Sequence, residues 1–242
     1  MSGAVDRRAL LSSAAAAAAA TPFSTAAFAA DKPKVVVFGG SGYVGAYTTK
    51  LLLSKGASVV SVSRKTPAEA VEKVKAILGS PLAGVEYVQM DAKSGDLASV
   101  LSGASAVISC IGIAPGGNDM RDGNGLANVK IADAAKQAGI GKFVYLGLAS
   151  ELANSPIKFV FGDYVKGKAE AEAAVGKDYG AAALVIKPGI IAGGPPGEVR
   201  PPGPPGMTPV PVEAVASAAV AGALGTAAGT VDGNAAIVAA AK

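Results

Sequence analysis

The residues best suited to ligand chemistry form a glycine-rich loop directly after the first apolar run, residues 35–38. The loop reads Gly39, Gly40, Ser41, Gly42, Tyr43, Val44 and Gly45. Gly39 permits a tight turn, Gly42 lets the backbone approach a ligand, and Gly45 lets a following helix pack closely. Amide groups and the dipole at the start of that helix favour bound phosphate. The loop predicts a dinucleotide diphosphate site; the alternative is a glycine-rich turn in another kind of α/β protein.

Tyr164 and Lys168 form the second candidate group, because they stand four residues apart in a stretch of helical pattern, residues 162–175. Positions i and i+4 share one face of a helix. A lysine ammonium beside a tyrosine lowers the pKa of the phenol, which can then act as acid or base next to a carbonyl or hydroxyl group. The pair therefore predicts proton transfer at a reacting substrate.

The composition excludes several other chemistries. The 242 residues contain no histidine and one cysteine, Cys110, which excludes histidine bases, histidine- or cysteine-ligated metal sites and disulfides within the chain. No metal site is expected. The net charge of +4, from 22 basic and 18 acidic residues, is spread along the chain, so no nucleic-acid partner is expected either.

Two basic residues, Arg64 and Lys65, end the second apolar run. An acidic residue at that place would bind the ribose 2′-hydroxyl of NAD. A guanidinium can instead hold a 2′-phosphate through two hydrogen bonds. The sequence therefore predicts NADP(H) as the preferred cofactor, with NAD(H) as the other possibility. The alternative is that both residues are solvated surface cations.

Short apolar runs alternate with helical stretches along the part of the chain that must position these residues. The predicted strands are residues 35–38, 58–62, 85–88, 106–111, 142–146 and 182–186. The predicted helices are residues 43–54, 68–78, 96–101, 122–138, 162–175 and 212–224, and residues 235–239 form a last strand or helix. Such alternation predicts parallel strands with helical crossovers. We expect a single α/β domain, a doubly wound parallel sheet of the Rossmann type with a short C-terminal extension on the substrate side.

Residues 1–30 read as a cleavable targeting segment rather than as part of the domain, which would span residues 31–242. Arg7 and Arg8 precede a short alanine-rich run, and residues 27–29 offer a small-residue cleavage site. A plastid transit peptide is the expectation, with the thylakoid lumen as one destination. A mitochondrial address, or bacterial export through the twin-arginine-like pair, is the alternative. No transmembrane helix is expected in the mature chain.

A proline- and glycine-rich segment, residues 188–211, interrupts the alternation of strands and helices. It predicts an exposed loop. Residues 195–206 could also bind a protein partner.

The spacing G-x-x-G-x-x-G, with Tyr-x-x-x-Lys on the helix after the fifth strand, resembles the extended and atypical short-chain dehydrogenases/reductases. The resemblance covers nearly all of residues 34–240. The runs 142–146 and 164–172 resemble a plastid and mitochondrial subgroup, related to NmrA-like proteins and to NAD(P)H-binding accessory proteins of respiratory complex I and of coenzyme Q synthesis. Several of these relatives bind the nucleotide without an established reaction.

The resemblance implies further positions for the cofactor. Asp91, after the third strand, matches the residue that contacts the adenine amino group, and Ile111 and Gly112 match the backbone beside the adenine ribose. Lys168 would hold the nicotinamide ribose. Pro188, in a segment resembling Arg-Pro-Gly, would face the nicotinamide.

One expected position departs from this pattern. Gly147 and Leu148 stand where the superfamily has serines that orient the substrate oxygen, and Ser150 is displaced by two residues. Two functions therefore follow. The first is an NADP(H)-dependent oxidoreductase with Tyr164, Lys168 and Ser150 as catalytic residues, acting on a small carbonyl, hydroxyl or quinone-like substrate. The second is a non-catalytic NAD(P)H-binding accessory or assembly protein of an organellar membrane complex.

Overall fold

The computed structural model describes residues 32–197 and 206–241, so the predicted targeting segment and the middle of the proline-rich loop lie outside the described residues. Within those ranges, seven parallel strands form one sheet in the order β3-β2-β1-β4-β5-β6-β7. The strands are β1 (Lys34–Phe38), β2 (Ser58–Ser63), β3 (Val85–Gln89), β4 (Ala106–Ser109), β5 (Phe143–Leu146), β6 (Leu184–Lys187) and β7 (Gly229–Asp232). The predicted doubly wound parallel sheet is confirmed.

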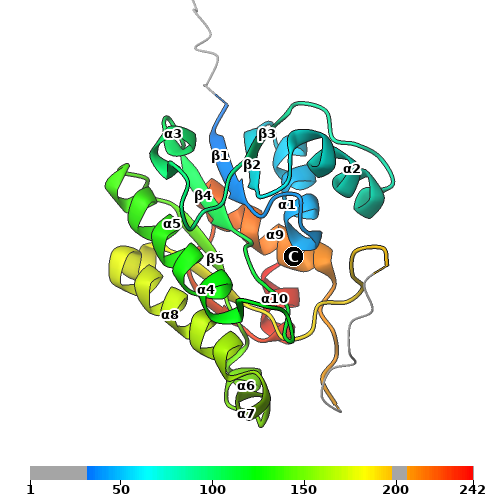
Figure 1. Ribbon diagram of the computed structural model, residues 1–242, viewed down its shortest axis with the longest axis vertical. Helices are drawn as coiled ribbons and strands as arrows, with labels where there is room; N and C mark the ends of the chain where they lie inside the picture. Colours follow the sequence, from blue (N-terminus) through cyan, green and yellow to red (C-terminus); the bar gives the residue numbers. More distant parts are fainter. Residues whose placement is uncertain (1–31, 198–205, 242) are drawn as a thin grey trace, which may run out of the picture. The chain divides into compact units, whose positions relative to one another are not determined.

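Helices cover both faces of the sheet, as Figure 1 shows. They are α1 (Tyr43–Ser54), α2 (Pro67–Leu78), α3 (Leu97–Leu101), α4 (Met120–Asn124), α5 (Leu126–Gln137), α6 (Ser150–Ala153), α7 (Ile157–Val160), α8 (Gly162–Tyr179), α9 (Val212–Leu224) and α10 (Asn234–Ala240). Helix α1 packs against α9 on one face, and α5 packs against α8 on the other. None of the helices in the described ranges is long and apolar enough to cross a membrane.

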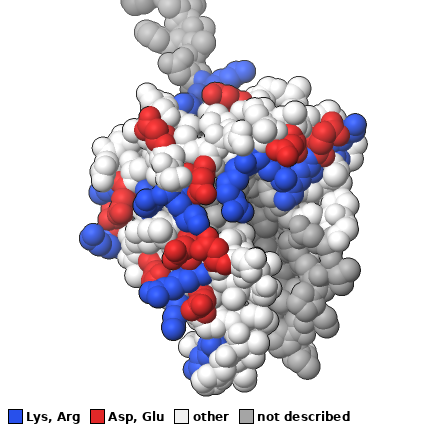
Figure 2. Space-filling model, viewed as in Figure 1, with Lys and Arg blue, Asp and Glu red and all other residues white. Residues whose placement is uncertain are grey.

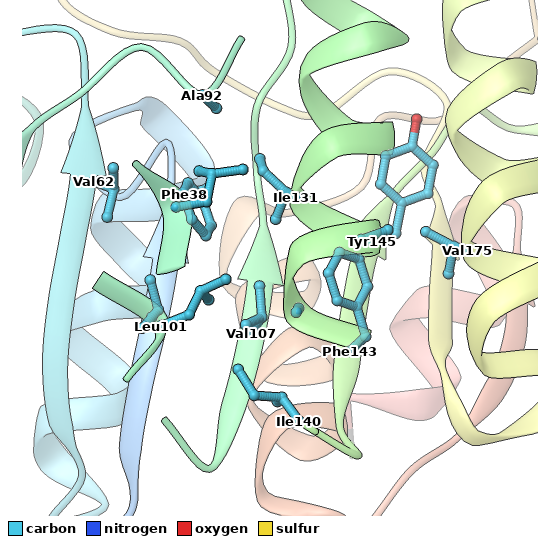
Figure 3. Close-up of a cluster of buried hydrophobic side chains, with 14 of the residues drawn as sticks. Phe38, Val62, Ala92, Leu101, Val107, Ile131, Ile140, Phe143, Tyr145 and Val175 are labelled. Carbon is cyan, nitrogen blue, oxygen red and sulfur yellow. The ribbon is translucent and has the colours of Figure 1, made fainter. Parts of the chain in front are cut away.

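Alternate side chains of the strands feed two separate cores. Val35 and Val37 belong to the core under α1 and α9, whereas Val36 and Phe38 belong to the core under α5 and α8. Figure 3 shows the second core, where Phe143 of β5 lies near Ile140 and Val107. Successive side chains of a strand point to opposite faces, so a strand between two helical layers must be apolar at every position.

The order in which successive strands are added to the sheet reverses between β1 and β4. Strand β1 pairs with β2 on one side and with β4 on the other. Strands β2 and β3 follow on one side of β1, and β4 and the later strands follow on its other side. The loops that leave the carboxyl ends of β1 and β4 therefore turn to opposite faces and leave a crevice between them, which is where ligands bind in sheets of this kind.

Two predicted elements differ from the structure. The helix expected at 122–138 is divided into α4 and α5 at Gly125, whose backbone leaves the helical region (φ −96°, ψ −81°). A side chain at this position would also come within 3.1 Å of the Gly167 Cα in α8. The last element, expected at 235–239, is helix α10, and the seventh strand lies before it. Strand β7 has only four residues and is partly exposed, so its apolar signal in the sequence is weak.

Candidate functional site

The glycine-rich loop forms the predicted tight turn between β1 and α1. Gly39 has φ +77°, in the left-handed region, and its N–H donates to the Val62 carbonyl at 2.8 Å. The Gly42 N–H donates to the Gly39 carbonyl at 2.8 Å. A Cβ on Gly45 would lie 2.7 Å from the Gly40 Cα and closer still to the Gly39 carbonyl oxygen. Because Gly45 has no Cβ, the first turn of α1 can lie directly against the loop.

A cleft of about 220 Å³ opens at the carboxyl ends of β1, β2, β3 and β4, at the reversal point of the sheet. Eight residues predicted for cofactor binding line it: Gly39, Ser41, Gly42, Arg64, Lys65, Asp91, Ile111 and Gly112. They come from four different strand ends that are far apart in the sequence. The fold thus brings the loop, the basic pair and the predicted adenosine contacts to one place.

Six other predicted cofactor residues do not line this cleft, and one of them, Lys168, is described below. Gly40 and Gly45 pack behind the loop, where a Cβ on Gly40 would meet the Ser61 side chain. The Tyr43 hydroxyl donates to the Ala192 carbonyl at 3.0 Å, across to the segment that follows β6. The other two are Val44, in the first turn of α1, and Pro188, which is buried. These residues shape or surround the loop rather than form the wall of the cleft.

The basic pair is held by the start of helix α2. Thr66 caps that helix in a reciprocal arrangement with Glu69, whose carboxylate accepts from the Thr66 N–H at 2.8 Å. These bonds lower the pKa of Glu69. The Gln89 amide donates to the Arg64 carbonyl at 3.2 Å and ties the turn to β3. The turn that presents Arg64 and Lys65 is therefore fixed on both sides.

The opposite wall of the cleft is closed by an ion pair that the sequence did not indicate. The Lys93 ammonium pairs with the Asp119 carboxylate, which raises the pKa of Lys93. Asp119 has φ +62°, and within the described ranges no other residue except glycine has a positive φ. Asp91 lies beside the pair and accepts the Lys93 N–H at 2.9 Å. In Figure 2, basic and acidic side chains lie close together on this face.

Lys168 lies behind the cleft rather than in its wall. Its ammonium donates to the Leu146 carbonyl at 2.8 Å, and a Cβ on Gly112 would lie 3.3 Å from it. The side chain is 7% exposed, and its burial lowers the pKa of Lys168 from 10.5 to about 8. Cys110, next to it, is half-buried, and desolvation raises the pKa of its thiol to about 12. At neutral pH the Cys110 thiol is therefore protonated, and the side chain packs at the edge of the cleft.

A second cavity, of about 420 Å³, lies on the other side of Lys168. Ser150, Lys168, Glu172 and Lys187 are among its lining residues. Lys187 pairs with Glu172 at 2.9 Å and lies 3.8 Å from Asp232, whose carboxylate accepts the Ser150 N–H at 3.0 Å. The start of α6, the ends of β6 and β7, and helix α8 are thus joined by one network of ion pairs and a hydrogen bond.

The structure therefore brings two of the three predicted catalytic residues to one cavity. Ser150 and Lys168 both line the second cavity. Tyr164 lies one helical turn before Lys168 in α8, near the buried hydroxyl of Tyr145, and lines neither cavity. Sequence analysis missed three charged residues of the cleft, Lys73, Lys93 and Asp119, because no local pattern distinguishes them from surface charges.

A glycine-rich turn, a crevice at the reversal point of a parallel sheet and polar groups at four strand ends define a dinucleotide-binding protein. The chain matches the NAD(P)H-binding family over residues 39–226 and belongs to that family. It is 36% identical over 160 residues to a protein of Arabidopsis thaliana described as uncharacterized and chloroplastic. That match covers 66% of this chain and 51% of the relative, so this chain spans about half the length of the relative it matches.

Solved structures share the fold. The Bordetella bronchiseptica enzyme WbmH in complex with NAD+ is 20% identical with a TM-score of 0.62, and the match covers 83% of this chain and 75% of that one. The oxidoreductase ylbE of Lactococcus lactis is 21% identical with a TM-score of 0.55, covering 76% and 82% respectively. The resemblance to extended and atypical short-chain dehydrogenases/reductases is thereby confirmed at the level of the fold.

Proposed function

We propose that this protein is an NADP(H)-dependent oxidoreductase of the atypical short-chain type, acting on a small carbonyl, hydroxyl or quinone-like substrate. The observation that carries the proposal is the cleft at the sheet reversal, which has the glycine loop on one side and two basic residues, Arg64 and Lys65, on another. The backbone of the loop comes close enough to a ligand only because Gly39 and Gly42 lack a Cβ. These features fit the diphosphate and the 2′-phosphate of NADP(H).

In this proposal each group of the cleft holds one part of the cofactor. Ser41 and the loop amides bind the diphosphate, Asp91 contacts the adenine, and Ile111 and Gly112 line the ribose. When bound, the nicotinamide supplies or accepts a hydride. Lys168, which lies directly behind Gly112, is assigned to the nicotinamide ribose on the family resemblance.

Proton transfer is assigned to Tyr164, with Lys168 as the cation that lowers the pKa of its phenol and Ser150 as the group that orients the substrate oxygen. Lys168 and Ser150 share the second cavity, which supports a substrate site there. The phenol of Tyr164 would donate a proton to a carbonyl oxygen during reduction and accept it from a hydroxyl during oxidation.

The cofactor preference predicts a selective effect of Arg64→Gln. NADPH binding should weaken by about tenfold, since a charge-assisted hydrogen bond to the phosphate is worth about 1.5 kcal/mol or more. NADH binding should stay within twofold. Isothermal titration calorimetry of the full chain measures both dissociation constants. If Arg64→Gln weakened binding of NADPH and of NADH equally, the assignment of Arg64 to the 2′-phosphate would be contradicted.

The catalytic assignment predicts that Tyr164→Phe lowers turnover by about a hundredfold or more, since a positioned general acid contributes at least that factor. NADPH affinity should not change, because Tyr164 does not line the cleft. Consumption of NADPH is followed at 340 nm with a series of small aldehydes, ketones and quinones. Tyr47→Phe, in helix α1, is the matched control and should retain full turnover. Unchanged turnover in Tyr164→Phe would reject the mechanism.

The second candidate is a non-catalytic NAD(P)H-binding accessory protein of an organellar membrane complex. It is favoured by Gly147 and Leu148 at the end of β5, where a serine would orient the substrate, and by the position of Tyr164 outside both cavities. It predicts NADPH binding without turnover of any carbonyl or quinone, together with co-purification of a complex, for which residues 195–206 are the proposed contact.

We propose a plastid location, with residues 1–30 as the targeting segment. The support is the chloroplastic description of the Arabidopsis relative and the basic, alanine-rich composition of these residues. Import of the full chain into isolated chloroplasts, with loss of about 30 residues, tests the proposal.

A further inference from the structure

Lys73 lines the same cleft as Arg64 and Lys65, although it comes from the second turn of helix α2. It stands seven residues after the capping residue Thr66 and therefore lies on nearly the same face of the helix. Side chains of a helix lean toward its N-terminus, so the ammonium of Lys73 is directed toward the turn that carries the basic pair. Its side chain is half-buried, whereas Lys75, on the same helix, is exposed and lies 3.8 Å from Glu72.

These three cations face the cleft without a paired carboxylate. In the described part of the chain, no acidic oxygen lies within 4.0 Å of the charged nitrogens of Arg64, Lys65 or Lys73. Of the two acids of α2, Glu69 is engaged in capping the helix, and Glu72, the residue directly before Lys73, lies 3.8 Å from Lys75. Lys93, on the opposite wall, differs because it is paired with Asp119. Like charges that line one cleft without an ion-pair partner repel one another, so this part of the cleft favours an anion.

We infer that Lys73 is a third ligand of a phosphate monoester at this corner, and so a specificity-determining residue that completes the subsite. The inference rests on the proposed NADP(H) function, in which that group is the 2′-phosphate. A phosphate monoester carries close to two negative charges at pH 7 and presents three acceptor oxygens, which suits a cleft lined by these three cations. A ribose 2′-hydroxyl offers no charge for Lys73 to bind.

The experiment isolates the phosphate from the rest of the cofactor. Adenosine 2′,5′-bisphosphate and adenosine 5′-monophosphate differ only in the 2′-phosphate, and calorimetry of the full chain at physiological salt measures both. We expect Lys73→Gln to weaken binding of the bisphosphate by about five- to tenfold. The dissociation constant of the monophosphate should stay within twofold of the wild-type value. Lys75→Gln removes the same charge from the outer face of α2 and should change neither constant more than twofold, because salt screens distant charges.

The possible outcomes separate the two claims. If the unmodified protein binds both nucleotides equally, the proposed NADP(H) preference fails and Lys73 has no 2′-phosphate to bind. If the protein prefers the bisphosphate and Arg64→Gln removes that preference, but Lys73→Gln behaves as Lys75→Gln does, only the role of Lys73 is overturned. Lys73→Arg should retain at least half of the preference, since it keeps the charge.

Discussion

Gly45→Ala should weaken NAD(P)H binding by more than about a hundredfold, which corresponds to about 2.7 kcal/mol. The added methyl group would lie 2.7 Å from the Gly40 Cα and nearer to the Gly39 carbonyl oxygen, so the loop and the first turn of α1 must separate. Alanine stabilises a helix by about 1 kcal/mol relative to glycine, but overpacking of this kind costs about 1–3 kcal/mol. Both obstructing groups here belong to the backbone, so they cannot move aside as a flexible side chain could. We therefore also expect a lower free energy of unfolding.

Gly176→Ala is the matched control. Gly176 lies in helix α8, and nothing lies within 4 Å of the position that its Cβ would take. The substitution should raise the free energy of unfolding by up to about 1 kcal/mol and leave cofactor affinity unchanged. Urea unfolding and calorimetry measure the two quantities. A Gly45→Ala protein that is folded and binds NADPH like the wild type would show that the close contact of loop and helix is not needed.

Lys168→Met should raise the free energy of unfolding at pH 7 while removing the proposed oxidoreductase activity. Burial lowers the pKa of Lys168 from 10.5 to about 8 in the folded protein. Holding the charged form in the folded state therefore costs about 3 kcal/mol below pH 8, at about 1.4 kcal/mol for each pKa unit. Part of this is offset by the hydrogen bond to the Leu146 carbonyl. We expect a net gain of about 2 kcal/mol for the variant at pH 7.

The higher free energy of unfolding of Lys168→Met, relative to the wild type, should disappear with rising pH. Between pH 8 and 10.5 the unfolded chain keeps a proton on Lys168 that the folded chain has released, so the wild type becomes more stable relative to the variant as the pH rises through this window. Urea unfolding at pH 7 and at pH 10 measures the difference. Lys166→Met, at an exposed position of the same helix, should stay within about 0.5 kcal/mol of the wild type at both values. A difference between Lys168→Met and the wild type that does not depend on pH would contradict the buried charge.

Lys168 also connects stability with the proposed reaction. Its ammonium is what would lower the pKa of the Tyr164 phenol, and the burial that makes this cation costly also strengthens its field. Such a residue is expected where function is maintained at the expense of stability.

Local patterns in the sequence were sufficient for the elements that carry the loop. The helices expected at residues 43–54 and 212–224 have those bounds in the structure, and the turn between β1 and α1 was predicted from its glycines. These elements depend on periodicity, on apolar runs and on the φ that Gly39 must adopt, all of which are encoded within a few residues. The same reasoning predicted the parallel sheet and the basic pair at the end of β2.

Contacts between distant segments decided the rest. Strand β7 is stabilised by its pairing with β6, and the close approach of Gly167 in α8 leaves no room for a side chain at Gly125. The pairing of Lys93 with Asp119, the place of Lys73 in the wall of the cleft and the shared cavity of Ser150 and Lys168 each join residues from different elements. A side chain's charge is written in the sequence, but its neighbours and its exposure to water depend on how helices and strands pack, and these set what the charge can bind.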